Sequence, residues 1–216
     1  KEGRASLNMT VDNGGTVLHV AADHGHTEVV RALVETVVAM VVDAGDARGF
    51  TALHCAAALG NSEIATLLLD EGLATIDARA SAGFTPLHTA AAASTDHHAV
   101  ARVLLEHGAV VDAKPVHFNT ALHAAAGKGH LESVRVLLDY GARFDALDDR
   151  GYAPVDIAAE NSHMDVLQLL LRSGAIVALA MNKLGLRIER PVFMEAEVIF
   201  SEAPLPAHVL GTHRRP

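Results

Sequence analysis

Histidine is the residue with the most potential for chemistry in this chain, which contains 14 histidines among 216 residues. An imidazole can act as a general base or bind a metal ion near neutral pH. Two places invite such an interpretation. Asp96, His97 and His98 follow one another and could bind a metal, and Cys55 directly follows His54 and could serve as a nucleophile.

Neither place supports a reactive site. Zinc needs three or four converging ligands, and adjacent histidines on one loop rarely converge without ligands from elsewhere. A longer polar loop is the simpler interpretation of residues 94–98. Cys55 stands among small apolar residues, and the order of residues suggests no Ser-His-Asp or Cys-His arrangement. The sequence therefore predicts no catalytic residue, no metal site and no cofactor.

Half of the histidines instead belong to a repeated pattern. The tetrapeptide Thr-x-Leu-His, followed by two alanines, ends at His19, His54, His88 and His123, and a degenerate copy ends at Asp156. These positions recur at steps of 33 to 35 residues. A second set recurs in the turn that would join two helices: His26, His130 and His163.

Pairs of helices are the elements that must position these histidines. The threonine of each complete tetrapeptide can cap a first helix, and Pro86 and Pro154 stand where the start of a helix tolerates proline. Paired alanines such as those at 56 and 57 keep that helix thin. Apolar spacing such as that of Ile64, Leu67 and Leu68 predicts a second helix, and glycines then end the helices.

Together these features resemble the ankyrin-repeat family from about Asp12 to Ala175. The resemblance implies an all-α solenoid of five helix–turn–helix repeats with β-hairpin fingers, in which the motif histidines bond to the loops. The expected repeats cover about 12–45, 46–79, 80–113, 114–147 and 148–175. A degenerate half-repeat finger is expected over 176–190, and a C-terminal extension with a strand and a Pro-rich tail over 191–216.

Three segments depart from the pattern. Residues 37–42 are interpreted as a longer helix or a terminal cap in preference to an exposed patch for a partner. The finger over 114–119 lacks the usual aspartate and glycine, so it could be a specificity element or a loop that has drifted. Residues 192–200 read as a strand that could cap the last repeat or dock on a partner.

Composition narrows the class of protein. A net charge of −9, without a basic stripe carrying aromatics, argues against nucleic-acid binding. No apolar run is long enough for a membrane span. The single Cys55 rules out an internal disulfide framework and favours an intracellular location. Among such locations the cytoplasm is preferred to an organelle. The chain begins at Lys1 and not at Met, so we expect a processed product or part of a longer chain.

The expected function is non-catalytic binding of another protein, which could belong to a large complex, with no small-molecule substrate. By resemblance, the contacts lie at the finger tips and at the ends of the first helices. The residues so placed are Asp23, His24, Arg48, Phe50, Leu59, Phe84, His117, Phe118, Asn119, Lys128, Arg150 and Tyr152. The aromatic one step before the threonine position in three repeats would be an exposed anchor or would pack on the neighbouring finger.

Two other functions stay open. One is a structural subunit anchored in a large multiprotein assembly. The other is a regulatory part of a longer chain that contains an enzyme.

Overall fold

The computed structural model describes residues 10, 13–36, 42–115 and 119–183, with side chains described as far as Gly174. The chain divides into two compact units, residues 1–170 and residues 171–216. The predicted strand over 192–200, the Pro-rich tail, and most of the apolar segment 37–42 lie outside the described residues. Val42, the last residue of that segment, is buried in the core.

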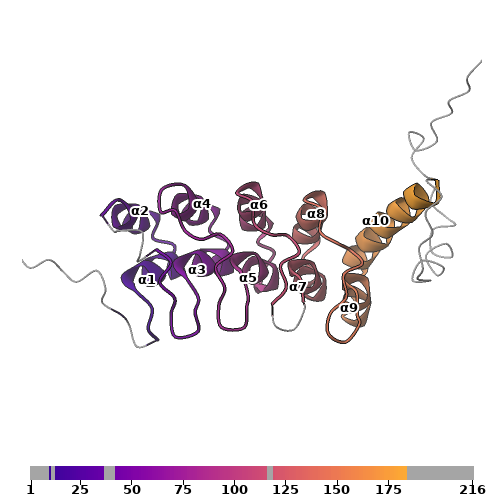
Figure 1. The fold of residues 1–216 in the computed structure, drawn as a ribbon, viewed down its shortest axis with the longest axis horizontal. Coiled ribbons are helices and arrows are strands. Elements are labelled where there is room, and N and C mark those ends of the chain that lie inside the picture. Colours follow the sequence, from indigo (N-terminus) through magenta and orange to yellow (C-terminus); the bar gives the residue numbers. More distant parts are fainter. Residues whose placement is uncertain (1–9, 11–12, 37–41, 116–118, 184–216) are drawn as a thin grey trace, which may run out of the picture. The chain divides into compact units, whose positions relative to one another are not determined.

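Helices come in pairs along the described chain (Figure 1), which confirms the predicted all-α repeat solenoid. The first helices of the pairs are α1 (Val17–Asp23), α3 (Ala52–Leu59), α5 (Pro86–Ala92), α7 (Ala121–Lys128) and α9 (Pro154–Glu160). The second helices are α2 (Thr27–Thr36), α4 (Ser62–Asp70), α6 (His98–Glu106), α8 (Leu131–Asp139) and α10 (Met164–Lys183).

The first helices stand side by side in one row and α2, α4, α6 and α8 in a second row, as Figure 1 shows. The paired alanines explain the close approach within the first row, because Ala56, Ala57, Ala90 and Ala91 are fully buried between neighbouring helices. The leucine of each complete tetrapeptide is also buried, and each such side chain contributes about 1.5–3 kcal/mol to folding. Stacking of repeats therefore builds one elongated core.

Each complete tetrapeptide begins its helix through a reciprocal cap. Thr16, Thr51, Thr85 and Thr120 are the N-cap residues of α1, α3, α5 and α7. The backbone N–H of each threonine donates to the Nδ1 atom of the histidine three residues later, at 3.0 to 3.3 Å. This bond satisfies a backbone donor that a helix start would leave without a partner.

The connections between repeats are tight turns, and the described residues contain no named strand. In the second repeat, the N–H of Asp46 donates to the carbonyl of Phe50 at 2.8 Å, and Gly49 closes the turn with a φ of 77°. Glycine is suited to this left-handed backbone because it has no Cβ. The fingers at 46–50, 80–84 and 148–152 thus keep the hairpin turn that the resemblance implied, and no strand of the described residues extends from them.

A ladder of aspartates also joins consecutive repeats. A carboxylate oxygen of one repeat accepts a hydrogen bond from a backbone N–H of the next at 2.8 to 3.2 Å. The pairs are Asp43 with Thr75, Asp77 with Val110, and Asp112 with Arg143.

The fifth repeat is expected to end at Ala175, with a finger after it, but α10 continues through Gly174 to Lys183. A single glycine costs a helix about 1 kcal/mol relative to alanine. The residues that follow, 175–181, are mostly Ala, Leu, Ile, Val and Met and include no proline, so nothing in them stops the helix. The predicted finger therefore does not begin at 176, and residues 184–190 lie outside the described ranges. None of the helices within those ranges has the length and apolar character needed to span a bilayer.

Candidate functional site

Three motif histidines join one repeat to the next. Each ring uses Nδ1 as an acceptor within its own repeat and extends Nε2 to the backbone carbonyl that ends the following finger. The Nε2 atoms of His19, His54 and His123 lie 2.7, 3.1 and 3.1 Å from the carbonyl oxygens of Phe50, Phe84 and Tyr152. Because a carbonyl only accepts, Nε2 must carry the proton. This confirms the bonding to loops that the resemblance implied for these three.

Burial favours the neutral form of His54, His88 and His123. Removal from water lowers the pKa of His54 and of His123, although the carbonyls of Phe84 and Tyr152 favour the charged form. For His88, burial lowers the pKa to about 4, against the opposing effect of the nearby Ala113 and Asn119 carbonyls. A buried imidazole with both nitrogens engaged cannot exchange protons with a substrate, so His54 and His123 are structural.

His88 differs from the other three motif histidines in the environment of its Nε2 atom. Its ring is 1% exposed, yet Nε2 makes no hydrogen bond to any described residue, and the buried Oδ1 of Asn119 makes none to them either. Asn119 occupies the position held by Phe50, Phe84 and Tyr152 in the other repeats. These two unsatisfied atoms belong to the boundary with the finger over 114–119, whose sequence departs from the pattern. A buried donor without a partner costs about 1–3 kcal/mol.

A second set of histidines points the other way along the stack. His97, His130 and His163 each precede the first residue of a second helix, and each bonds to a carbonyl at the end of the preceding repeat's first helix. The acceptors are Ala58, Ala91 and Gly127, at 3.1, 3.2 and 3.1 Å. The sequence analysis missed His97 because the third repeat has two extra residues between its helices. His97 therefore does not fall at the spacing from the tetrapeptide that His26, His130 and His163 share.

Asp96 explains the rest of that insertion. Its carboxylate accepts from the backbone N–H of Glu132 at 2.9 Å and from the backbone and hydroxyl of Ser133. Ser133 is fully buried near the start of α8, so Asp96 supplies the helix with an acceptor from another repeat. Within the described ranges no three His, Cys, Asp or Glu side chains gather to hold a metal. The loop joins two repeats.

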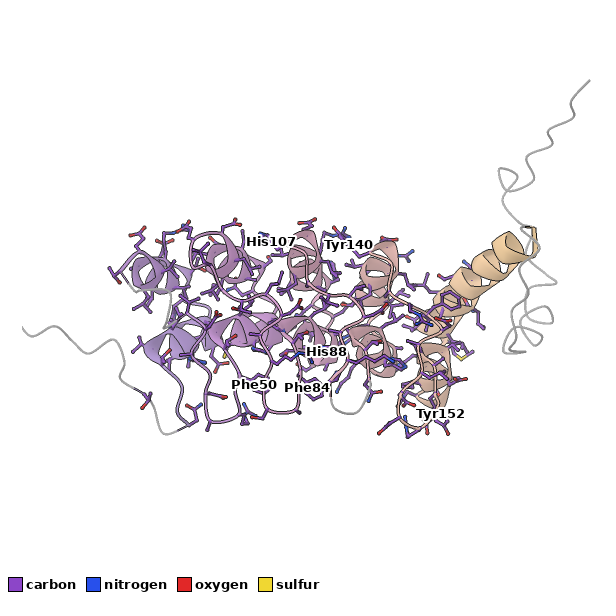
Figure 2. All side chains as sticks on the ribbon, viewed as in Figure 1. Phe50, Phe84, His88, His107, Tyr140 and Tyr152 are labelled. Carbon is purple, nitrogen blue, oxygen red and sulfur yellow. The ribbon has the colours of Figure 1, made fainter. Side chains whose placement is uncertain are left out.

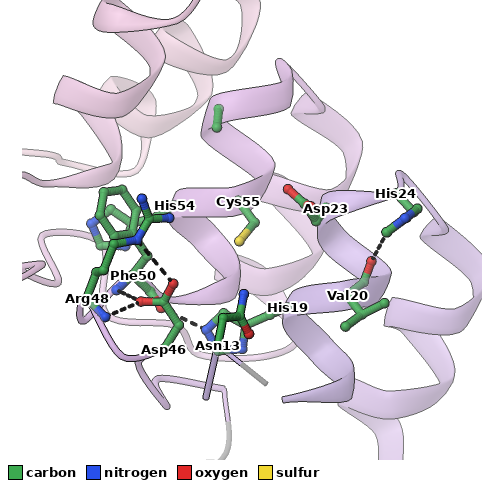
Figure 3. A pocket seen from close by; sticks show the side chains of 11 residues that line it. Asn13, His19, Val20, Asp23, His24, Asp46, Arg48, Phe50, His54 and Cys55 are labelled. Carbon is green, nitrogen blue, oxygen red and sulfur yellow. Dashed lines mark hydrogen bonds and ion pairs between the residues drawn. The ribbon is translucent and has the colours of Figure 1, made fainter. Parts of the chain in front are cut away.

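A groove of about 340 Å³ opens between the first two repeats (Figure 3). Arg48, Asp46 and Phe50 from the second finger lie on one side, Asp23 and His24 at the end of α1 lie on the other, and Cys55 lies between them. The remaining lining residues are Asn13, His19, Val20, His54 and Ala58. The structure therefore brings together four of the residues predicted for partner contact: Asp23, His24, Arg48 and Phe50.

Two fingers share an Asp-x-Arg-Gly-aromatic sequence and the same geometry. Asp46 Oδ1 accepts from the backbone N–H groups of Arg48 and Phe50, each at 2.9 Å. Asp148 Oδ1 accepts from those of Arg150 and Tyr152 at 2.9 and 2.8 Å. Burial opposes ionisation of both aspartates, but these bonds and the neighbouring arginine prevail and lower the pKa of each carboxyl.

The aromatics of the fingers are partly covered. The Arg48 guanidinium carbon lies 4.8 Å from the Phe50 ring centroid, and the Arg150 carbon lies 4.7 Å from that of Tyr152. The Phe50 ring also packs edge-on against His54 of the same repeat, with 5.1 Å between the ring centroids. Phe84 packs edge-on against His88 in the same way. Figure 2 places Phe50, Phe84 and Tyr152 on the finger side, away from His107 and Tyr140. The rings thus pack first within their own repeats.

The other predicted contact residues are spread along the stack. Leu59, at the end of α3, is 46% exposed, and Lys128, at the end of α7, is exposed. Asn119 is half-buried. His117 and Phe118 lie outside the described residues.

Cys55 faces the groove but has an unreactive thiol. Burial raises its pKa to about 12, and the nearby carboxylates of Asp23 and Asp46 add to that rise. The thiolate is the nucleophilic form, so almost none of it is present at neutral pH. His54, the neighbouring imidazole, is committed to Thr51 and Phe84. This pair offers no route to covalent chemistry.

Comparison with known proteins agrees with this architecture. A family model described as "Ankyrin repeats (3 copies)" matches residues 3–80, 42–115 and 114–180. The B-cell lymphoma 3 protein homolog of Mus musculus is 33% identical over 124 residues, which are 56% of this chain and 27% of that protein. Alpha-latrotoxin-Lt1a of Latrodectus tredecimguttatus and alpha-latrotoxin-Lh1a of Latrodectus hasselti are each 33% identical over 69 residues.

The extent of these matches decides what they show. Each latrotoxin match covers 32% of this chain and 5% of the toxin, and the chain spans about a quarter of the length of the lymphoma protein homolog. The family model, in contrast, matches most of the chain, across all five repeats. With its tetrapeptide period, its paired helices and its histidine ladders, the chain belongs to the ankyrin-repeat family.

Proposed function

We propose that this chain is a non-catalytic protein-binding module whose partner lies along the finger loops and first helices of residues 13–161. Ankyrin repeats generally mediate protein–protein interaction. The observation that supports this surface here is the groove beside Arg48, where side chains from two repeats meet around an open volume of about 340 Å³. A partner segment seated there would contact two consecutive repeats at once.

The chemistry of the groove favours binding over catalysis. Its imidazoles at 19 and 54 donate to backbone carbonyls, and its one thiol has a pKa raised to about 12. What remains exposed is a set of contact groups: the Arg48 guanidinium, the Asp23 carboxylate and the Val20 side chain. We also propose an intracellular location, because the one cysteine cannot form an internal disulfide.

Site-directed crosslinking tests the proposal. A photoreactive benzoylphenylalanine replaces Ala58, which is exposed in the groove, or Ala99, which is exposed in the second-row helix α6. Both variants are irradiated in extract from the native source, and captured proteins are identified by mass spectrometry. We expect at least one protein to be captured from position 58 and not from position 99.

The captured protein is then purified and titrated calorimetrically against the wild type and two double variants. Arg48→Ala/Phe50→Ala changes the groove, and Arg102→Ala/Arg135→Ala changes exposed arginines of the second row. The groove variant should bind more weakly by about 1–3 kcal/mol. Equal capture from both positions, or affinity that ignores the groove variant, rejects this surface.

A further inference from the structure

Arg48 and Arg150 are exposed cations held in one fixed geometry at two fingers. In both, Nε pairs with the buried aspartate two residues earlier, at 3.7 Å for Asp46 and 3.2 Å for Asp148. In both, the guanidinium lies over the aromatic ring two residues later, Phe50 or Tyr152. The aspartates are 8% and 0% exposed at their side chains, whereas the arginines are 76% and 55% exposed.

This geometry leaves one edge of each guanidinium available. The aromatic ring covers a face of the guanidinium. The Nε of Arg150 donates a hydrogen bond to Asp148, whereas the Nε of Arg48 forms a longer ion pair with Asp46. The two terminal Nη groups of Arg48 and of Arg150 make no hydrogen bond to any described residue. Two parallel N–H donors on a planar fork match the two oxygens of a carboxylate. Because the ion pair and the ring contact already favour one side-chain position, binding would sacrifice less rotamer freedom than for an arginine without them.

Arg79, beside another finger, differs because one of its terminal nitrogens bonds within the protein. Arg79 Nη1 donates to the carbonyl of Gly83 at 3.4 Å and to that of Lys114 at 3.2 Å, so it links two fingers. Its own finger has neither the aspartate nor the arginine of the Asp-x-Arg-Gly sequence. The available edge therefore belongs to the two fingers that carry this sequence.

We propose that Arg48 and Arg150 bind carboxylate side chains of an extended acidic segment of the protein partner. This inference rests on the proposed function and names the chemistry of its partner. The acidic neighbours of the two arginines set the orientation of the segment. Asp23 lies across the groove from Arg48. The carboxylate of Glu160 lies close enough to Arg150 to attract its positive charge. Glutamates or aspartates of the segment therefore face the fingers, and neutral or basic side chains face the first helices.

A carboxylate fits these positions better than a phosphate. Each site offers a single guanidinium, and Asp149 precedes Arg150 directly in the sequence. A phosphate carries about twice the charge of a carboxylate at neutral pH, so the surrounding acids repel it more. The net charge of −9 on the whole chain acts in the same direction.

Peptide titrations with the full chain test the proposal. The probe is a fluorescein-labelled 20-residue peptide of alternating Glu-Gly-Ala units, compared by anisotropy with its Gln, Lys and phosphoserine counterparts. We expect the Glu peptide to bind more tightly than all three. Arg48→Ala/Arg150→Ala should weaken its binding about tenfold, the sum expected of two ion pairs. Arg102→Ala/Arg135→Ala, with the same change in net charge, should weaken it less than about threefold.

Arg48→Lys/Arg150→Lys keeps the charge and the fold while removing the fork, so its affinity should fall between wild type and the alanine variant. Circular dichroism confirms that each variant is folded. Equal weakening by the two alanine pairs, tighter binding of the phosphoserine or Lys peptide, or lysine variants equal to wild type would overturn the proposal. A partner captured at position 58 that contains no acidic contact segment overturns this inference alone and leaves the protein-binding function standing.

Discussion

The Nε2 atom of His54 lies 3.1 Å from the carbonyl oxygen of Phe84, so an imidazole of the second repeat donates to the loop that starts the third. The equivalent atom of His88 makes no hydrogen bond to the part of the chain that the structure describes, although its ring is also buried. One repeat boundary in the stack therefore lacks a hydrogen bond that the boundaries on either side of it have. This contrast makes the contribution of a single bond measurable within one protein.

His54→Ala should destabilise the protein more than His88→Ala, by about 1–3 kcal/mol. Both changes delete a buried ring and its Nδ1 bonds to threonine. Only the first also leaves a carbonyl without its donor, whereas the second removes a donor that was already unsatisfied. Urea unfolding of the two variants at pH 7.5 gives the difference. Equal losses, or a larger loss for His88→Ala, would show that the Nε2 bond contributes nothing.

Acidification should unfold the stack before its carboxylates are protonated. Burial lowers the pKa of His54 and His123, and that of His88 to about 4, so these rings bind fewer protons when folded than when unfolded. The stability they provide is complete above about pH 6.5 and is lost as the pH falls below it, down to about pH 4 for His88. Each ring can contribute a slope of up to about 1.4 kcal/mol per pH unit.

Urea midpoints between pH 7.5 and 4.5 test this slope, with His88→Asn as the matched variant. In that variant the free energy of unfolding should change less with pH, by the contribution of about one bound proton. An unchanged slope in His88→Asn, or a midpoint that stays constant down to pH 5, contradicts the assignment.

His107 should have the opposite pH dependence. The Val103 carbonyl and the Asp70 carboxylate, which lies 3.0 Å from Nε2, raise the pKa of this exposed ring. Its contribution is therefore present below about pH 6.5 and disappears as the pH rises through the folded-state pKa. Exposure keeps the effect below about 1 kcal/mol. NMR titration of the ring in wild type and in Asp70→Asn is the direct measurement, and an identical midpoint in both would exclude the ion pair as a cause.

Gly60→Ala should be more destabilising than Gly108→Ala. Both glycines have positive φ, at 73° and 90°, where alanine costs about 1–2 kcal/mol. An added Cβ at Gly108 meets nothing within 4 Å, but at Gly60 it would overlap the ring of His97. Combining Gly60→Ala with His97→Ala should recover part of the excess loss, as thermal unfolding would show. Additive losses in the double variant would mean that the two residues do not clash.

Much of the fold was predictable because its signals are local. The Thr-x-Leu-His tetrapeptide predicted where α1, α3, α5 and α7 begin, since cap, first turn and buried leucine lie within four residues. The resemblance to ankyrin repeats implied that motif histidines would bond to loops, which holds for His19, His54 and His123. The period near 34 then implied stacking, because one repeat cannot bury its own apolar face.

Contacts between repeats were decided by tertiary structure alone. Asp96 binds the start of α8 and His97 bonds to Ala58, each across 36 residues or more, and no local pattern contains both partners. The arginine forks likewise needed the turn geometry that places Arg48 over Phe50 and Arg150 over Tyr152. The helix that continues past Gly174 shows the same limit, because a glycine ends a helix only where the surrounding chain favours a turn. The amino-acid sequence by itself determined the repeat, whereas stacking decided which side chains meet, since their partners come from other repeats.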